Sequence, residues 1–159
     1  MSNDLINSLN KTTFEAMIFD TTHINKEAKE LTNDLVGLPF SFLQSLKMGG
    51  IGSKRMIIEE TSQNLFQYIN KISDINYANI ELRPNGIIVL LNKGLYNFNW
   101  IIPYRQLVIY KTDRLSIHAQ GSYICFKNNK LYKENKKFIT KMITLRATNQ
   151  ENELNPAYE

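Results

Sequence analysis

The sequence predicts an α+β protein, with a helical first half followed by short antiparallel strands and one last helix. Up to residue 76, apolar side chains recur at steps of three and four, the period of a helix that buries one face. From Tyr77 the period becomes two, and glycine, proline and asparagine turn signals follow at short intervals. Connections this short leave no room for a helix between strands, so neighbouring strands are expected to be antiparallel.

Length and composition limit the class of protein. The chain has 159 residues, which is typical of one domain with a substantial core. Its content of 43% hydrophobic and 21% charged residues is globular, and the single cysteine, Cys125, excludes a disulfide scaffold. The start, MSNDLINSLN, is too polar for a signal peptide, and no stretch reaches the roughly 20 apolar residues of a spanning helix. We therefore expect a cytoplasmic domain.

Three helices are expected in the first half. Residues 21–36 form the first, which ends at Gly37, and its apolar face carries Ile24, Ala28, Leu31 and Leu35. Residues 40–48 form a short apolar helix that ends at Gly49-Gly50. Ser53 is expected to cap a third helix that runs to about residue 73. Residues 12–19 satisfy neither period, so a strand and a helix both remain open there.

Six strands and a final helix are expected in the second half. In the clearest strand, Tyr96, Phe98 and Trp100 alternate with polar residues, which predicts an inward-facing aromatic stripe. The strands are expected at residues 79–83, 86–91, 96–102, 107–111, 115–119 and 122–126. Residues 135–149 then form a helix with an apolar stripe opposite several lysines, and residues 150–159 are expected to be a loose tail.

This order of elements resembles the pleckstrin-homology-like (PH-like) barrel over residues 77–149. The segment Trp100–Tyr104 and the hairpin at 115–126 are similar to bacterial members of that family. The resemblance implies a barrel of six to seven strands plugged by the last helix, with residues 1–76 as an N-terminal helical extension. Lipid-binding members carry several Lys and Arg in the first loop, whereas residues 83–86 hold only Arg83, so no phosphoinositide site is carried over.

Charge is divided unevenly along the chain. Residues 1–82 hold seven Lys and Arg against ten Asp and Glu, whereas residues 83–146 hold twelve against two. The formal charge of +4 therefore conceals a strongly basic second half. Such blocks predict either a basic face for an acidic partner or two halves that neutralise each other.

The candidate anion- or partner-binding residues follow from this division. Lysines on the polar side of the last helix could meet an acidic protein or an anionic membrane surface. The segment Gly49–Arg55 resembles a phosphate cradle, although its spacing matches neither the Walker A motif nor the dinucleotide fingerprint. The candidates are Lys130, Lys133, Lys137, Lys141, Arg105, Arg114, Ser53, Lys54 and Arg55.

The residues that could support chemistry are few. His118 shares a strand face with Ser116 and Gln120 and could lie near Cys125, but this set completes neither a catalytic triad nor a zinc site. Glu59 and Glu60 are adjacent on the expected third helix and should diverge. We therefore expect no metal, no cofactor and no enzymatic activity, and we interpret the chain as a binding or scaffolding module.

Two other functions remain open at this stage. The aromatic stripe, with Arg105, Lys111 and Arg114, could bind single-stranded nucleic acid by stacking. A small ligand could instead lie inside the barrel, in a cavity lined by Tyr96, Trp100 and Tyr110. The apolar segment 38–48 is expected to be buried or to form a homo-oligomer interface.

Overall fold

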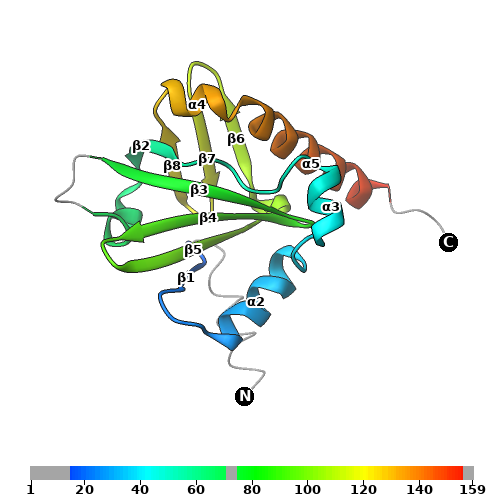
Figure 1. Ribbon diagram of the computed structural model, residues 1–159, viewed down its shortest axis with the longest axis horizontal. Helices are drawn as coiled ribbons and strands as arrows, with labels where there is room; N and C mark the ends of the chain where they lie inside the picture. The colour runs from blue at the N-terminus through cyan, green and yellow to red at the C-terminus, as the bar shows by residue number, and fades with distance from the viewer. Residues whose placement is uncertain (1–14, 71–74, 156–159) are drawn as a thin grey trace.

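The computed structural model describes residues 15–70 and 75–155, which form an α+β fold around one open antiparallel sheet of eight strands (Figure 1). Its strand order is β1-β5-β4-β3-β2-β8-β7-β6. The strands are β1 (Ile18–Asp20), β2 (Met56–Thr61), β3 (Asn76–Arg83), β4 (Gly86–Lys93), β5 (Tyr96–Pro103), β6 (Val108–Lys111), β7 (Leu115–Ala119) and β8 (Ser122–Phe126). The helices are α2 (Lys26–Val36), α3 (Phe42–Lys47), α4 (Lys130–Glu134) and α5 (Lys136–Leu154), with the short 3-10 helices η1 (Gln63–Tyr68) and η2 (Tyr104–Gln106).

The predicted succession of short antiparallel strands is broadly confirmed. β3, β4 and β5 pair in chain order, and so do β6, β7 and β8. The turn between β7 and β8 places Gln120 and Gly121 at φ 53° and 72°, the left-handed geometry that closes a tight hairpin. β5 lies near one edge of the sheet and β6 forms the opposite edge. The chain crosses from one to the other through η2.

The third predicted helix, from Ser53 to about residue 73, is wrong. That segment forms β2 and then η1, and Leu65 of η1 is fully buried. Ile57, Thr61 and Leu65 have helical spacing, but the β-branched pair Ile57-Ile58 also suits a strand. The segment pairs with β3 on one side and with β8 on the other, and these strand pairings favour the strand over the helix.

Strand β2 joins the two halves of the sheet. Before it in the order come β1, β5, β4 and β3, and after it come β8, β7 and β6. The segment expected to be a helical extension, residues 1–76, thus supplies two strands, β1 and β2. Of residues 12–19, which fitted neither period, Ile18 and Phe19 lie in β1, and residues 12–14 fall outside the described chain.

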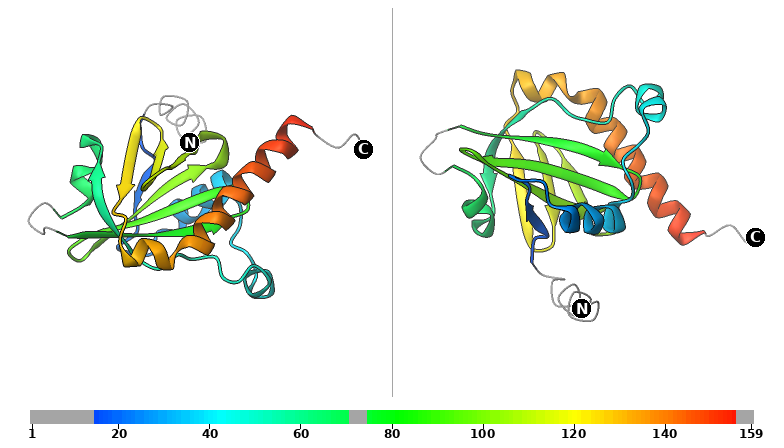
Figure 2. Two further views of the ribbon diagram at one scale, coloured as in Figure 1. Left: turned by 90° about the horizontal axis from the view of Figure 1, so that it is seen from above. Right: turned by 60° about the horizontal axis from the view of Figure 1, so that its bottom comes forward.

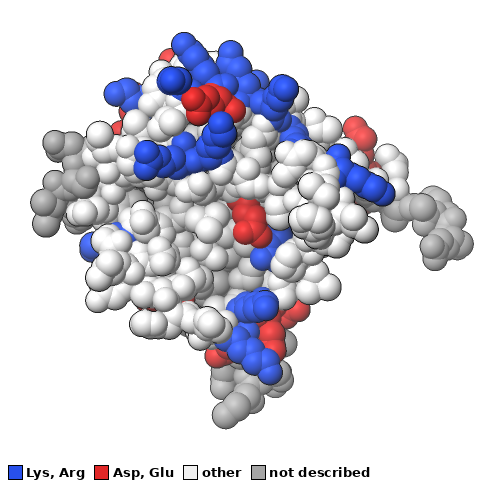
Figure 3. Space-filling model, viewed as in Figure 1, with Lys and Arg blue, Asp and Glu red and all other residues white. Residues whose placement is uncertain are grey.

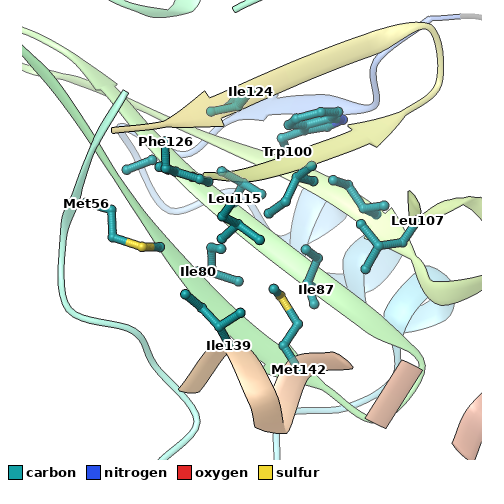
Figure 4. Packing of buried hydrophobic residues seen from close by; sticks show 14 of the residues in the cluster. Met56, Ile80, Ile87, Trp100, Leu107, Leu115, Ile124, Phe126, Ile139 and Met142 are labelled. Atoms are coloured by element: carbon teal, nitrogen blue, oxygen red, sulfur yellow. The ribbon is translucent and has the colours of Figure 1, made fainter. Parts of the chain in front are cut away.

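The hydrophobic core lies between the two halves of the sheet and α5. Figure 4 shows Ile139 and Met142 of α5 directed toward Ile80 and Ile87, with Trp100 and Phe126 across the core. All six side chains are fully buried, which confirms that the aromatic stripe turns inward at Trp100. The inward-facing stripe does not include Tyr96, the first residue of β5, whose side chain is 59% exposed.

Helix α2 covers the other face of the sheet. Asn25 caps its first turn by accepting a hydrogen bond from the Ala28 N–H at 3.2 Å. Its last residue, Val36, is fully buried against Ile88 and Ile101. A smaller apolar cluster therefore backs β4 and β5 on the side opposite the main core.

Helix α5 is longer than expected. It continues to Leu154, so residues 150–154 of the predicted loose tail are helical, although 151–154 are exposed. Figure 2 shows this end projecting beyond the sheet. The expectation for residues 156–159 lies outside the described residues. No helix in the described parts of the chain is long and apolar enough to cross a membrane.

Candidate functional site

Lysines gather at one end of the molecule, over α4 and the start of α5 (Figure 3). Tyr132 of α4 and Phe138 and Ile139 of α5 are buried, and this burial turns the polar sides of both helices toward solvent. The side chain of Asn129 caps α4 by accepting from the Tyr132 N–H at 3.1 Å. The exposed lysines here, which we call the lysine face, are Lys127, Lys130, Lys133, Lys136 and Lys137.

Among the described residues, no carboxylate of the acidic half pairs with the lysine face. Within residues 15–70 and 75–155, no carboxylate lies within ion-pair distance of these lysines. The nearby carboxylate of Glu134 pairs instead with Lys54, at 3.8 Å between Oε2 and Nζ. The face therefore presents positive charge to solvent.

The buried side chain of Asn135 fixes the junction of α4 and α5 to the loop before β2. Its Oδ1 accepts from the Lys54 N–H at 2.9 Å, and its Nδ2 donates to the Lys54 carbonyl at 3.2 Å. Lys54 is thereby placed beside the lysine face. Arg55 turns away, with its guanidinium 4.5 Å from the centre of the Tyr77 ring.

The glycine-rich loop does not have the geometry of a phosphate cradle. The backbone N–H groups of Gly50 and Ser53 donate to the carbonyls of Ser45 and Ile80, both at 2.8 Å. The Ser53 hydroxyl accepts from the Ile80 N–H at 2.9 Å. A strand follows the loop, so no helix N-terminus is directed at it. The donors of this loop hold it to β3 and to the C-terminal end of α3.

The other candidate cations do not join the lysine face as one group. Lys141 donates from Nζ to the Gly50 carbonyl at 2.7 Å, so its ammonium is partly used inside the protein. Arg105 lies in η2, before β6, and Arg114 follows β6, so the strand separates them. Arg114 is also paired with two carboxylates.

Arg114 binds both Glu59 and Glu60 of β2. Its NH1 lies 2.7 Å from Glu59 Oε2, and its NH2 lies 3.3 Å from Glu60 Oε2. Adjacent residues of a regular strand point to opposite faces, but the register shifts between Ile58 and Glu60, where two steps along β2 match one along β8. This bulge directs both carboxylates to the arginine, which corrects the expectation that they diverge on a helix.

A polar pocket lies beside this ion pair, on the sheet face opposite the core. It has a volume of ≈ 620 Å³ and is lined by Glu59, Glu60, Thr112, Asp113, Arg114, Ser116, His118, Tyr123 and Cys125. Ser116 lies opposite Cys125 and His118 opposite Tyr123 in the β7–β8 register. The His118 Nε2 and Ser116 Oγ are 3.1 Å apart, and the Tyr123 hydroxyl donates to Glu60 at 2.8 Å. Ser116, His118 and Cys125 thus line one pocket. Gln120, which was expected on the same strand face as Ser116 and His118, instead turns inward and bonds to Trp100 and Ile101.

The groups in this pocket are not arranged as an activated nucleophile and base. Burial raises the pKa of the Cys125 thiol, which favours the protonated, poorly nucleophilic form. Burial also lowers the pKa of His118 below its ordinary value of 6.5. The carboxylate of Glu60 is bound by Arg114 and Tyr123 instead of orienting the imidazole. In the part of the chain that is described, no three His, Cys, Asp or Glu side chains cluster to hold a metal.

Helix α3 carries an exposed apolar surface that was expected to be covered. Leu38, Phe42, Leu43 and Leu46 are 68%, 77%, 69% and 62% exposed, so this segment is not buried within the chain. Only the flanking Phe40 and Met48 pack partly against the core. The second part of that expectation, a homo-oligomer interface, remains a prediction.

Two aromatic side chains named for the alternative functions lie where those functions do not need them. Trp100 is fully buried, so it offers no stacking surface to a nucleic-acid base. Tyr110 packs edge-on against His118 on the outer face of the sheet, with ring centres 5.0 Å apart, whereas Trp100 lies in the core. Tyr96, Trp100 and Tyr110 therefore do not line a shared cavity.

Comparison with known protein families, curated proteins and solved structures gives no match. The function has to be argued from the surface of the chain itself.

Proposed function

We propose that this chain is a non-enzymatic binding module whose lysine face attaches it to an anionic surface. The observation that carries the proposal is that the cations of the basic half differ in whether a carboxylate pairs with them. Arg114 is paired with carboxylates, while the five lysines of the face are exposed and have none among the described residues. A concentrated positive charge held on fixed helices attracts anionic partners and increases their rate of encounter.

The architecture also supports the resemblance to a PH-like barrel, which we retain as part of the proposal. β2 to β8 are seven antiparallel strands, and α5 follows them and packs Ile139 and Met142 into the core. In this reading, β1, α2 and α3 are additions to the barrel. Folds of this kind serve many unrelated functions, so the binding role rests on the lysine face alone.

Charge reversal with a matched control tests the proposal. The variant Lys130→Glu/Lys133→Glu/Lys137→Glu reverses three of the five charges of the face, while Lys26→Glu/Lys29→Glu/Lys93→Glu makes the same change in net charge at exposed lysines elsewhere. Retention on immobilised heparin, a soluble polyanion, is measured as the salt concentration needed for elution. We expect the first variant to elute at much lower salt than the wild type, and the control to change little.

Two results would argue against the proposal. Equal losses in both variants would mean that net charge, and not the lysine face, governs retention. No retention of the wild type even at low salt would mean that the face does not bind anions. Circular dichroism of each variant checks that the fold is retained.

A further inference from the structure

The exposed side of α3 is unusually apolar for a helix that contributes nothing to the core. None of its six residues is buried, and Phe42, Leu43 and Leu46 are each more than half exposed. A short helix gains little from its own backbone hydrogen bonds, so helices of this length normally depend on packing of an apolar face. Here that apolar face is directed to solvent.

The chain nevertheless holds α3 firmly in place. Ser41 and Gln44 form a reciprocal capping box, with hydrogen bonds of 3.2 and 2.9 Å. At the other end, Gly49 and Gly50 take φ angles of 74° and 95°, which terminate the helix. The neighbouring Phe40 and Met48 pack against the core. The apolar side chains are thus presented on a fixed support.

Helix α3 and the lysine face lie on the same side of the molecule. Both views of Figure 2 place α3 and α4 along one edge. Lys141 of α5 reaches the loop after α3 through its 2.7 Å hydrogen bond to Gly50, and Lys137 lies one turn earlier on the same side of α5. Lys47, within α3, is also exposed. The apolar patch is therefore bordered by positive charge.

We propose that α3 and the residues before it form a membrane hook, which inserts Phe42, Leu43 and Leu46 of the helix and the preceding Leu38 into the interface of an anionic bilayer while the lysine face binds the headgroups. This inference rests on the proposed function and names its anionic surface as lipid. Aliphatic and aromatic side chains gain free energy by entering the boundary between headgroups and acyl chains. Nearby lysines add attraction to anionic lipid, worth about fivefold in affinity for each lysine.

The shape of α3 favours lipid over a protein partner. In Figure 2 the helix lies at an edge of the molecule and projects from it. A fluid bilayer accommodates a projecting apolar group of any outline, whereas a protein partner would need a groove shaped to it. The lysines that border the patch complement anionic headgroups and add no affinity for a neutral bilayer.

Co-sedimentation with vesicles tests the contribution of the apolar side chains and that of the lysines. The probes are phosphatidylcholine vesicles with and without phosphatidylserine. We expect wild-type protein to bind the anionic vesicles, and Leu43→Ser/Leu46→Ser to bind on the order of 100-fold more weakly, since each leucine loses about tenfold. The control Ile24→Ser/Leu95→Ser removes two fully or largely exposed apolar side chains elsewhere and should bind as wild type. Equal losses in the two variants, or no binding by the wild type, would overturn the inference.

A tryptophan placed on the hook reports insertion directly. The chain has one tryptophan, Trp100, which is buried and supplies a constant background. In Leu43→Trp, emission should shift to the blue when anionic vesicles are added, and brominated lipid should quench it. If the protein binds the vesicles but this emission stays unchanged, the lysine face binds headgroups without insertion of α3. That result would disprove the membrane hook and leave the proposed function intact.

Self-association is the competing explanation for the apolar patch. Light scattering of the wild type and of Leu43→Ser/Leu46→Ser in the absence of lipid distinguishes the two. If α3 is a membrane hook, the wild type should be monomeric in the absence of lipid. A wild-type dimer that the double variant dissociates would show that a second copy covers α3, and the inference would then be wrong.

Discussion

The side-chain oxygen of Gln120 accepts a hydrogen bond from the indole Nε1 of Trp100 at 3.0 Å, inside the protein. The same oxygen accepts from the Met17 N–H at 2.8 Å. The Gln120 amide group donates to the Ile101 carbonyl at 3.0 Å and to Gln106 Oε1 at 2.7 Å. One buried side chain in the β7–β8 turn therefore ties that hairpin to β5 and to the segment before β1.

Replacement of Gln120 is expected to destabilise the fold strongly. Gln120→Ala leaves the buried Trp100 indole N–H and Ile101 carbonyl, and two half-buried polar groups, without their partner, at a cost of about 3 kcal/mol in the free energy of unfolding. Urea denaturation followed by Trp100 fluorescence measures the loss. Gln67→Ala, at an exposed glutamine, is the control and should change the free energy of unfolding by less than about 0.5 kcal/mol. A near-neutral Gln120→Ala would show that water replaces the amide.

Gly86 is expected to tolerate no side chain. A Cβ at this position would lie 2.5 Å from Val36 Cγ1 and 2.9 Å from Pro103 Cα, and would also meet the Ile102 carbonyl. Gly86→Ala should therefore cost about 3 kcal/mol, because backbone and α2 must separate to admit it. Gly52→Ala is the matched control, since a Cβ there meets nothing within 4 Å. Thermal unfolding of the two variants compares them, and equal midpoints would contradict the close approach of α2 to the sheet.

His118 is expected to make stability depend on pH near neutrality. Burial against Tyr110, Tyr123 and Ser116 lowers its pKa, so the folded chain binds fewer protons than the unfolded chain. The free energy of unfolding should then be fully retained above the unfolded pKa of about 6.5 and decline as the pH falls below it.

Urea titrations of wild type and His118→Gln between about pH 7.5 and about pH 5 measure this dependence. The variant should lose less stability over that range, while His23→Gln, at an exposed histidine, should follow the wild type. The lowered pKa values of Asp20 and Asp113 act only in more acidic solution, where protonation of these carboxylates removes stability. Parallel curves for wild type and His118→Gln would refute the expectation.

Local pattern was sufficient to predict most of the strands. The bounds of β7 and β8 agree with the alternation of side chains and the Gln120-Gly121 turn. These hairpins close over short stretches of chain, so the information that specifies them is nearby in the sequence. The inward turn of Trp100 follows from the same alternation.

Features that depend on distant segments were not predictable in this way. β2 acquires its strand character from β3 and β8, and the bulge that aims Glu59 and Glu60 at Arg114 exists only against β8. Single-strand periodicity carries no information about such a partner. The apolar composition of α3 was evident, but composition does not show whether other parts of the chain cover it.

The grouping of the candidate cations was predicted only in part. Lysines on α4 and α5 share a face because the helical period places them there. Lys54 reaches the same region through Asn135, a long-range contact that no motif marks. Arg105 and Arg114 were grouped by charge alone, and the topology sets them at the two ends of β6.

The position of β2 between β3 and β8 has a practical consequence for dividing the chain. A cut between η1 and β3 would yield two fragments, and neither would hold a complete sheet. The second fragment would expose the two strand edges that β2 normally occupies, and the first would carry the strand that fits between them. Such a pair is expected to regain the complete sheet only when the two fragments combine, so fragment complementation would report their proximity.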